Sequence, residues 1–588
     1  MVRRTTLWVV VGLAVAGLLA GCAGGRQRSP RAGPDWSRGV VVGDASINDV
    51  VALYPEPDGQ RVHLAWGWSA DDKGRIRYLQ LDGEGTVVEA HDLPLAVRSP
   101  RRVHLLPGTE EGLVAFYLSG VGDNRRLYAV RLSRAGEVLG GPVEVSGGEL
   151  EVDDYAVVST VAGADVFWCN DTYLTRGLYH RQVDHLGRPL GVSRLMVEGG
   201  TSPSAQTGDD GRVHLAWLYE PGALEEHIYY AAFDPATQEL GTPVRVGQFT
   251  LNPKATLYGP VVALGRGRVY IAWAWQQLAA TLGAAAGEGE CWYVTFPFGA
   301  AGTTDPRHLA LPSRSRPEYQ PAQGAFAYTQ LAAAREGGSA LVYMPNPVAG
   351  ERDEAALGLA FHTATRTGSR VQIGVVYLAG SELKGYQIAG QGGAMVMRPV
   401  LAADGQNHLH LAWLEPAGFH HYRVYYASTR QEVRAALGRF GRDDVIDGAY
   451  TVAWTLVQSV SMFPVAFVWL AVPLAWVVGY YLVKADADLG QRGPRIALGV
   501  AVALYILCKI VLMPGSFVEA APFVSYLSPA VANIYMGVLP VAILLVASGA
   551  LWLYLRRGES RTLLVGYVVF GATDALITLL LYAPGMLG

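Results

Sequence analysis

Histidines recur in the repeated β-type segments of this chain, and histidine can ligate a metal or transfer a proton near neutral pH. Each is interpreted as filling the same position of a repeated unit, inside an alternating strand. The repeat itself therefore explains why histidine recurs, and we predict neither a metal site nor a cofactor. The four residues are His63, His104, His214 and His410.

Adjacent aspartates near loops are the second set that could do chemistry. A glycosidase needs two carboxylates that converge on one bond, and acids scattered over several loops do not indicate such a pair. Turn formation accounts for them equally well, so no catalytic residue is predicted. The pairs are Asp71 and Asp72, Asp153 and Asp154, and Asp209 and Asp210.

Aromatic side chains form a third set, because tryptophan and tyrosine could supply a platform for a sugar or a peptide. Trp68, Trp275 and Tyr219 are the candidates. Packing in a core is the alternative role for most of them. The sequence leaves the ligand of any such platform open.

Two ionisable residues, Lys509 and Asp574, interrupt long apolar segments. Charged groups inside a membrane span are functional candidates by default. Both lie about twelve or thirteen residues from the same end of their segments, which at about 1.5 Å per residue places them at similar depth. An ion pair between two helices is one interpretation. A second interpretation is that Lys509 snorkels to the interface while Asp574 bonds to a hydroxyl. A third is an ion or proton pathway.

The four cysteines are too few for a disulfide framework in a chain of 588 residues. Cys169 and Cys291 belong to repeats two apart, which disfavours a bridge between them. Cys508 lies beside Lys509 within an apolar segment and is expected to be inert. Cys22 has a different setting, at the end of the first apolar stretch.

The N-terminus has the parts of a secretory signal: two arginines, an apolar stretch from Leu7 to Leu19, and small residues before a cysteine. The segment Leu19-Ala20-Gly21-Cys22 resembles the lipobox of bacterial lipoproteins. The resemblance implies cleavage of a signal peptide, residues 1–21, and a diacylglycerol group on the Cys22 sulfur. An uncleaved signal anchor is the alternative. Both interpretations place the following chain outside the cytoplasm.

Composition excludes some partners and favours others. The hydrophobic fraction of 51% and the charged fraction of 17% favour membrane content, and the net charge is only −4. Because there is no basic excess, nucleic acid is not an expected partner. The 70 glycines are spread along the chain and fit a protein with many tight turns.

A segment of the pattern Val-His-Leu-Ala-Trp recurs over about four hundred residues, in four clear and three weaker copies. The first four intervals between copies are 49–56 residues, near the period of about fifty that a four-stranded propeller blade requires. The last two intervals are 70 residues, which implies insertions before Tyr343 and Trp413. The repeats predict an all-β propeller of about seven four-stranded blades over residues 39–430. The aromatic residues that end the copies are Trp66, Tyr117, Trp168, Trp217, Trp273, Tyr343 and Trp413.

The last repeat has no outer strand, because residues 427–442 read as helix. The segment Gly39-Val40-Val41-Val42 precedes the first repeat and has no other partner. We expect it to complete the last blade and so to remove an exposed edge. Residues 22–38 are expected to be a flexible tether, and residues 431–450 a linker or amphipathic helix.

The repeat resembles the sialidase-like (BNR-repeat-like) propeller family. Pro203, Asp210-Gly211, the strand Val213 to Trp217 and the strand Ile228 to Tyr230 follow the order of parts in that family. The resemblance covers about residues 40–430 and implies the fold. The Ser-x-Asp-x-Gly-x-Thr-Trp box and an assignable arginine triad are absent, so the activity of the family is not carried over.

Four apolar runs follow Gly448, and each is long enough to cross a hydrocarbon core of about 30 Å. They predict an α-helical membrane domain of four transmembrane helices within residues 451–588. The runs cover about 455–483, 496–515, 531–555 and 562–584.

The loops between these runs predict the topology. Residues 484–495 and 556–561 carry lysine and arginine, whereas residues 516–530 carry neither. The positive-inside rule then places the two basic loops in the cytoplasm. The propeller and the C-terminus are expected on the extracytoplasmic side of the cytoplasmic membrane.

Three functions follow from this organisation. The first is a non-catalytic binding or scaffolding propeller for a protein or glycan, since a fold without a recognisable catalytic set does not assign a reaction. The second is a sialidase-like glycoside hydrolase, which clustered Arg, Glu and Tyr side chains at the central face would favour. The third is a sensor or transport-associated subunit.

Overall fold

The computed structural model contains a β-rich unit and a helical unit, which are described separately. The structure describes residues 32–46, 49–70, 73–108, 112–148, 150–172, 174–222, 224–252, 254–278, 289–312, 317–322, 326, 329–336, 348–349, 353–365, 368–390, 396–418, 420–438, 459, 462–484, 487–512, 529–556 and 561–587. The lipidation candidate Cys22 lies outside these residues, as do Asp71 and Asp72.

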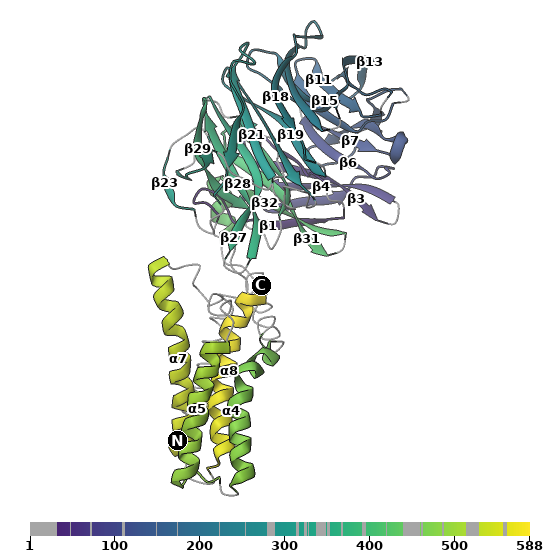
Figure 1. The fold of residues 1–588 in the computed structure, drawn as a ribbon. Coiled ribbons are helices and arrows are strands. Elements are labelled where there is room, and N and C mark those ends of the chain that lie inside the picture. The colour runs from purple at the N-terminus through teal and green to yellow at the C-terminus, as the bar shows by residue number, and fades with distance from the viewer. Residues whose placement is uncertain are drawn as a thin grey trace. The chain divides into compact units, whose positions relative to one another are not determined.

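The β-rich unit is a seven-bladed propeller of antiparallel sheets, as the repeats predicted (Figure 1). In the first four blades, the strands from the inner one outward are β2 (Ala52–Pro55), β3 (Arg61–Ala70), β4 (Lys73–Asp82) and β5 (Val87–Asp92); β6 (Arg101–Pro107), β7 (Gly112–Ser119), β8 (Arg126–Ser133) and β9 (Val143–Glu144); β10 (Asp154–Thr160), β11 (Gly163–Asn170), β12 (Gly177–Val183) and β13 (Pro189–Glu198); and β14 (Gly200–Thr207), β15 (Val213–Gly222), β16 (Glu225–Asp234), β17 (Glu239–Leu240) and β18 (Val244–Thr250).

The last three blades include two with added strands. Their strands are β19 (Ala255–Gly265), β20 (Arg268–Gln277), β21 (Gly289–Pro297), β22 (Arg307–Ala310) and β25 (Arg335–Glu336); β26 (Val348–Ala349), β27 (Glu354–Thr365), β28 (Gly368–Ala379), β29 (Glu382–Gly390), β24 (Gln330–Ala332) and β23 (Tyr319–Pro321); and β30 (Met397–Ala403), β31 (Leu409–Gly418), β32 (His421–Ser428) and β1 (Val40–Ala45).

The inner strands pack against one another in the order β2, β6, β10, β14, β19, β26 and β30, and β30 returns to β2. Strand β1 closes this ring, because it pairs with β32 from Val40 opposite Tyr426 to Ala45 opposite Tyr422. The predicted closing strand is therefore confirmed. Figure 1 shows the purple strands of the first blade beside the green strands of the last.

The repeated segment forms the second strand of a blade, and it is buried on both faces. In β15, Leu215 and Trp217 pack toward the third blade, whereas Ala216 and Leu218 pack toward the fifth. Burial on both faces requires a nearly continuous apolar run, which is why the pattern Val-His-Leu-Ala-Trp marks each blade.

The sixth blade differs from the prediction. Tyr343 lies outside the described residues, and the second strand of this blade is β27, in which Phe361 is buried. The long insertion therefore precedes Phe361 entirely. Part of it forms β24, which pairs with the outer strand β29, and β25, which pairs with β22. The insertion covers the outer edges of two neighbouring blades.

The expected flexible tether is wrong for residues 32–38, which pack on the propeller. Asp35 and Trp36 are 2% and 5% exposed. The Asp35 carboxylate accepts hydrogen bonds from the backbone amide and hydroxyl of Thr329, at 2.6 and 2.8 Å, and from Nε2 of Gln387 at 2.6 Å. Gly, Arg, Pro and Ser composition does not reveal this packing, because the partners lie about three hundred residues away.

Helix α2 (Gln431–Leu437) ends the propeller chain and buries Val433. The amide of Ser37 donates to the carbonyl of Ser428, and Arg434 pairs with Asp35 at 3.8 Å. Residues 32–38 and α2, which flank the propeller in the sequence, therefore lie next to each other.

Within its described residues, the helical unit contains four helices that are long and apolar enough to cross a membrane. They are α4 (Phe463–Val483), α5 (Arg492–Leu512), α7 (Pro529–Arg556) and α8 (Leu563–Leu587). Helix α8 is the most buried of the four. The amide of Leu489 donates to the carbonyl of Arg561 at 2.8 Å, so the two basic loops lie at the same end of the bundle. Their common position agrees with the predicted placement of both loops on one side of a membrane.

Candidate functional site

Each blade has a hairpin end, where its second and third strands are joined and its inner strand begins. In four blades the inner strand bulges there, opposite the repeated aromatic residue. The first bulged residue has a left-handed backbone at Arg102 (φ 48°), Ser202 (φ 48°) and Arg398 (φ 51°), and is Gly259 in the fourth case. Such strain costs about 1–3 kcal/mol and collects at functional sites. The bulges therefore mark the hairpin ends of the inner strands as a candidate site.

Three successive inner strands are joined there by a group that we call the central cluster: Asp49, Arg102, Asp154 and Tyr155. Asp49 Oδ2 accepts the amide of Arg102 at 2.5 Å, and Arg102 forms an ion pair with Asp154. The Tyr155 hydroxyl donates to the Arg102 carbonyl. The Arg102 side chain is nonetheless 47% exposed. The pairing fixes its position while leaving much of its guanidinium open to solvent.

The charges of the central cluster influence one another. Burial raises the pKa of Asp154 although Arg102 opposes the shift, and burial also raises the pKa of Tyr155. Asp154 and Asp49 stabilise the positive charge of Arg102 and raise its pKa, although partial desolvation opposes the shift. Arg102 is therefore a permanent cation held between two carboxyl groups.

A second group, the hairpin cluster, continues from the central cluster across the second, third and fourth blades. It contains Arg125, Asp153, Asp171, Arg176 and Glu220. Arg125 Nη1 lies 3.2 Å from Asp153 Oδ1, and Asp153 Oδ2 accepts the amide of Asp171 at 2.7 Å. Arg176 bridges Asp171 at 2.7 Å and Glu220 at 2.6 Å. The side chains of Asp171 and Glu220 are 55% and 37% exposed, so the cluster forms a rigid polar surface.

Glu226 lies at the same hairpin as Glu220 but has a different environment. Its side chain is buried, and its Oε2 has no hydrogen-bond partner. Burial, together with the charges of Glu220 and Asp171, raises the pKa of Glu226 to about 7. It could therefore hold a proton near neutral pH. Its Oε2 is enclosed and cannot pass a proton to a ligand on the surface.

Three of the four histidines form buried contacts with a tyrosine of the third strand. The Nδ1 atom lies 2.6–2.7 Å from the hydroxyl, and a carboxylate lies 3.1–3.6 Å from Nε2. Burial lowers the pKa of each histidine, so the rings are neutral at neutral pH. These contacts join strands within a blade. The carboxylate, histidine and tyrosine sets are Glu56, His63 and Tyr78; Asp210, His214 and Tyr230; and Asp404, His410 and Tyr426.

His104 does not share that position, contrary to the prediction. It lies on the inner strand β6, whereas the other three lie on second strands. The sequence pattern misled because His104 also sits in an apolar segment, Val103-His104-Leu105. Among the residues that the structure describes, no group of three or more His, Cys, Asp or Glu side chains could hold a metal ion.

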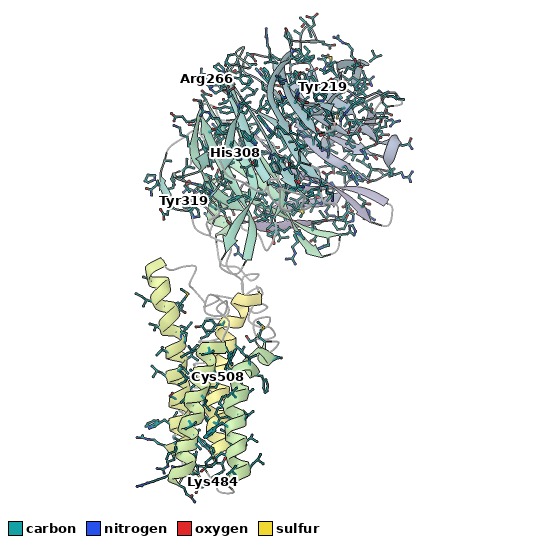
Figure 2. All side chains as sticks on the ribbon, in the orientation of Figure 1. Tyr219, Arg266, His308, Tyr319, Lys484 and Cys508 are labelled. Carbon is teal, nitrogen blue, oxygen red and sulfur yellow. The ribbon has the colours of Figure 1, made fainter. Side chains whose placement is uncertain are left out.

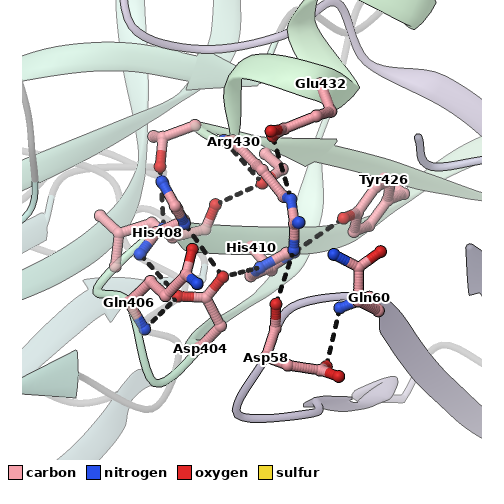
Figure 3. Close-up of polar contacts among 12 residues, drawn as sticks. Asp58, Gln60, Asp404, Gln406, His408, His410, Tyr426, Arg430 and Glu432 are labelled. Atoms are coloured by element: carbon pink, nitrogen blue, oxygen red, sulfur yellow. Dashed lines mark hydrogen bonds and ion pairs between the residues drawn. The ribbon is translucent and has the colours of Figure 1, made fainter. Parts of the chain in front are cut away.

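The set around His410 also seals the ring (Figure 3). Arg430, which is 5% exposed, donates from Nη1 to the carbonyl of Asp58 in the first blade at 3.1 Å and from Nε to Glu432 at 3.1 Å. The amide of Gly405 donates to the carbonyl of Pro57 at 3.0 Å. The first and last blades are therefore clamped through their turns, which makes this set structural.

In the helical unit, the structure brings Lys509 and Asp574 together. Lys509 Nζ lies 2.5 Å from Asp574 Oδ2 and 2.8 Å from the Thr578 hydroxyl. The Tyr505 hydroxyl donates to the same Oδ2 at 2.6 Å. The side chains of Lys509 and Asp574 are 6% and 0% exposed. The two residues therefore form a buried ion pair, and Lys509 does not snorkel.

The remaining candidates occupy separate places. Cys169 and Cys291 are free and buried in the third and fifth blades, and burial raises the pKa of both thiols. Trp68, Trp275 and Tyr219 are all half-buried at hairpin ends. Tyr219 is labelled in Figure 2.

Sequence reasoning found Asp153 and Asp154 but missed their partners Arg102 and Arg176. Arg102 lies 52 residues from Asp154 in the chain, so no local pattern links them. The doubled arginine Arg101-Arg102 before a predicted strand was the available signal.

No protein-family model and no curated protein matches this chain. Similar solved structures include the polysaccharide lyase Uly1 (10% identity, TM-score 0.41, covering 65% of this chain and 89% of that chain) and an ulvan lyase of family PL25 (9% identity, TM-score 0.40, covering 66% and 94%). The Dos1 propeller is another (10% identity, TM-score 0.36, covering 68% and 96%). At these identities and TM-scores the likenesses say nothing about the activity of this chain.

Proposed function

We propose that this chain is a membrane-held, non-catalytic binding module that takes a glycan at the hairpin ends of its propeller. The observation that carries the proposal is the continuous polar surface formed by the central and hairpin clusters. Its ion pairs hold the side chains in place before a ligand arrives, which lowers the entropy cost of binding. Their exposed faces remain able to exchange hydrogen bonds with sugar hydroxyls.

The charge of this surface limits the ligand. Arg102, Arg125 and Arg176 are outnumbered by carboxyl groups, and each arginine already contacts at least one of them. An acidic sugar would meet net repulsion there, because like charges disfavour association. The ligand is therefore a neutral or amino-bearing glycan, which also argues against a sialidase-like site.

Several observations support a role without catalysis. Asp153, Asp154, Asp171 and Glu220 each accept a bond from an arginine or a backbone amide. Carboxyl groups whose oxygens already accept such bonds are poorly placed to act as general acids. Glu226 could keep a proton, but its Oε2 is enclosed. The arrangement suits recognition of hydroxyl groups more than cleavage of a glycosidic bond.

The membrane attachment has two parts in this proposal. Cys22 carries lipid, and α4, α5, α7 and α8 cross the cytoplasmic membrane with the propeller and the C-terminus outside. Strand β1 begins and strand β32 ends at the turn end of the last blade, opposite its hairpin end.

The test uses the full-length protein in lipid nanodiscs and a panel of neutral, acidic and amino-bearing oligosaccharides. We expect binding of neutral or amino-bearing members, and a loss of at least tenfold in Arg176→Met. Arg188→Met is the matched control, because Arg188 pairs with Asp184 at the other end of the same blade. Absence of all binding, or preference for acidic members, overturns the proposed ligand. Release of shorter sugars would instead show a hydrolase.

Membrane attachment is tested separately. Labelling of cells with a fatty-acid analogue is expected to mark the wild-type protein and not Cys22→Ala. Labelling of cysteines introduced into residues 484–495 by a membrane-impermeant reagent in intact cells would contradict the proposed topology.

A further inference from the structure

A row of half-buried side chains crosses strands β19 to β22 of the fifth blade at its hairpin end. We call it the indole platform: Leu257, Trp275, Glu290, Trp292 and His308. Leu257 pairs with Trp275, Trp275 with Glu290, and Trp292 with His308 across the strands, so they share one face of the sheet. His308 is labelled in Figure 2. Trp273 fills the core position of the repeat, and Leu257 and Trp292 pack against the edge of the same cluster while remaining half-exposed.

The two tryptophans are held by one carboxylate. Glu290 Oε2 accepts the indole N–H of Trp275 at 3.3 Å and that of Trp292 at 3.2 Å. The Trp292 ring stacks on His308, with ring centroids 4.6 Å apart and planes 10° from parallel. Both indoles are therefore oriented in advance, while neither is fully covered.

The hydrogen bonds leave specific groups for a ligand. Both indole N–H groups donate to Glu290 Oε2, so the tryptophans can offer a ligand only the exposed carbon surface of their rings. Among the described residues, no lysine or arginine forms an ion pair with Glu290 within 4.0 Å, although such pairs are found for many other acids of the propeller. The uncompensated carboxylate disfavours an anionic ligand and can accept hydroxyl groups.

We propose that the indole platform is the subsite at which a neutral pyranose ring of the glycan stacks, with Glu290 accepting one of its hydroxyls. The proposal rests on the proposed function and adds the ring-binding residues and the neutral charge of the sugar. The apolar C–H face of a pyranose matches an indole surface, and burial of that face supplies binding energy without charge. An acidic sugar ring would place its carboxylate beside Glu290.

The test measures binding of a neutral oligosaccharide to the full-length protein in nanodiscs by titration calorimetry. Trp292→Ala and Trp275→Ala are each expected to weaken binding at least tenfold. Trp292→Phe retains a ring for stacking and is expected to stay within about threefold, because the aromatic face persists. Trp68→Ala is the matched control, since Trp68 is a half-buried tryptophan at the hairpin end of the first blade.

Glu290→Gln separates hydroxyl recognition from stacking. It retains an acceptor for the indoles but lacks the charge, so we expect an intermediate loss for neutral sugars and a gain for acidic ones. Thermal unfolding of each variant checks that the blade remains folded.

The outcomes distinguish the two proposals. If the wild type binds neutral oligosaccharide and the Trp292→Ala and Trp275→Ala variants bind equally well, the platform is not the subsite and the proposed function stands. If the wild type binds no oligosaccharide, the proposed function itself fails. Equal losses in Trp68→Ala and Trp292→Ala would also overturn the assignment, because the effect would not be specific to the fifth blade.

Discussion

Removal of either member of the Lys509 and Asp574 pair is expected to destabilise the helical unit, whereas removal of both is expected to restore it. In Asp574→Asn, the ammonium of Lys509 stays buried without a counter-charge, with only the neutral asparagine amide and the Thr578 hydroxyl nearby. In Lys509→Met, the carboxylate of Asp574 keeps only hydroxyl partners, of which Tyr505 is the closest. The double variant has no charge, and the amide oxygen of its introduced asparagine can still accept from Tyr505.

The magnitude follows from the burial of both groups, which are 6% and 0% exposed. Breaking a buried ion pair by removing one partner costs about 3–5 kcal/mol, whereas replacing both partners is often neutral. Each single variant should therefore lose about 3–5 kcal/mol, and the double variant should lie within about 1 kcal/mol of the wild type. The resulting coupling energy is well above the about 0.5 kcal/mol within which independent sites add.

The assay is unfolding of the full-length protein in detergent micelles with increasing sodium dodecyl sulfate, followed by far-ultraviolet circular dichroism of the helices. The wild type, both single variants and the double variant are measured under the same conditions. Additive losses would refute the pairing. A nearly silent Lys509→Met would point instead to a lysine that reaches the interface.

Three further predictions concern the propeller. Burial lowers the pKa of His104 from 6.5 to about 4, so the unfolded chain takes up the proton first as the pH falls. The contribution of His104 to the free energy of unfolding should be full above about pH 6.5 and decline toward pH 4. In urea unfolding, His104→Gln should therefore show a flatter pH profile than the wild type. Tyr426→Phe leaves the buried Nδ1 of His410 without its hydroxyl partner and should cost about 1–3 kcal/mol in urea unfolding; an unchanged midpoint would show that the contact contributes nothing. Asp35→Ala removes three hydrogen bonds and should make residues 32–38 susceptible to limited proteolysis. Protection equal to that of the wild type would contradict this prediction.

The blade count and the closing strand could be predicted from the sequence because they depend on local burial. A second strand that lies between two blades needs apolar residues on both faces, and this requirement recurs in Val62 to Trp66, Val213 to Trp217 and Leu409 to Trp413. The closing strand could be inferred because the last repeat lacked a partner. The sixth blade was misplaced because its second strand carries Phe361 in a segment without the repeated histidine and tryptophan pattern.

The candidate site could not be predicted, because its contacts join different blades. Arg102 meets Asp154, and Arg176 of the third blade meets Glu220 of the fourth. These residues become neighbours only when consecutive blades pack against each other and set their hairpin ends side by side. The same holds for Asp35, whose partners Thr329 and Gln387 lie in the insertion and the sixth blade.

The sequence by itself determined the strand pattern, the apolar helices and the charge of the loops between them, since each depends on residues close together in the chain. Only the tertiary structure decided which acids are paired, that Glu290 orients two tryptophans, and that Lys509 faces Asp574. A hydrogen bond or ion pair requires atoms within about 3–4 Å, and sequence spacing does not specify separations that small between distant segments.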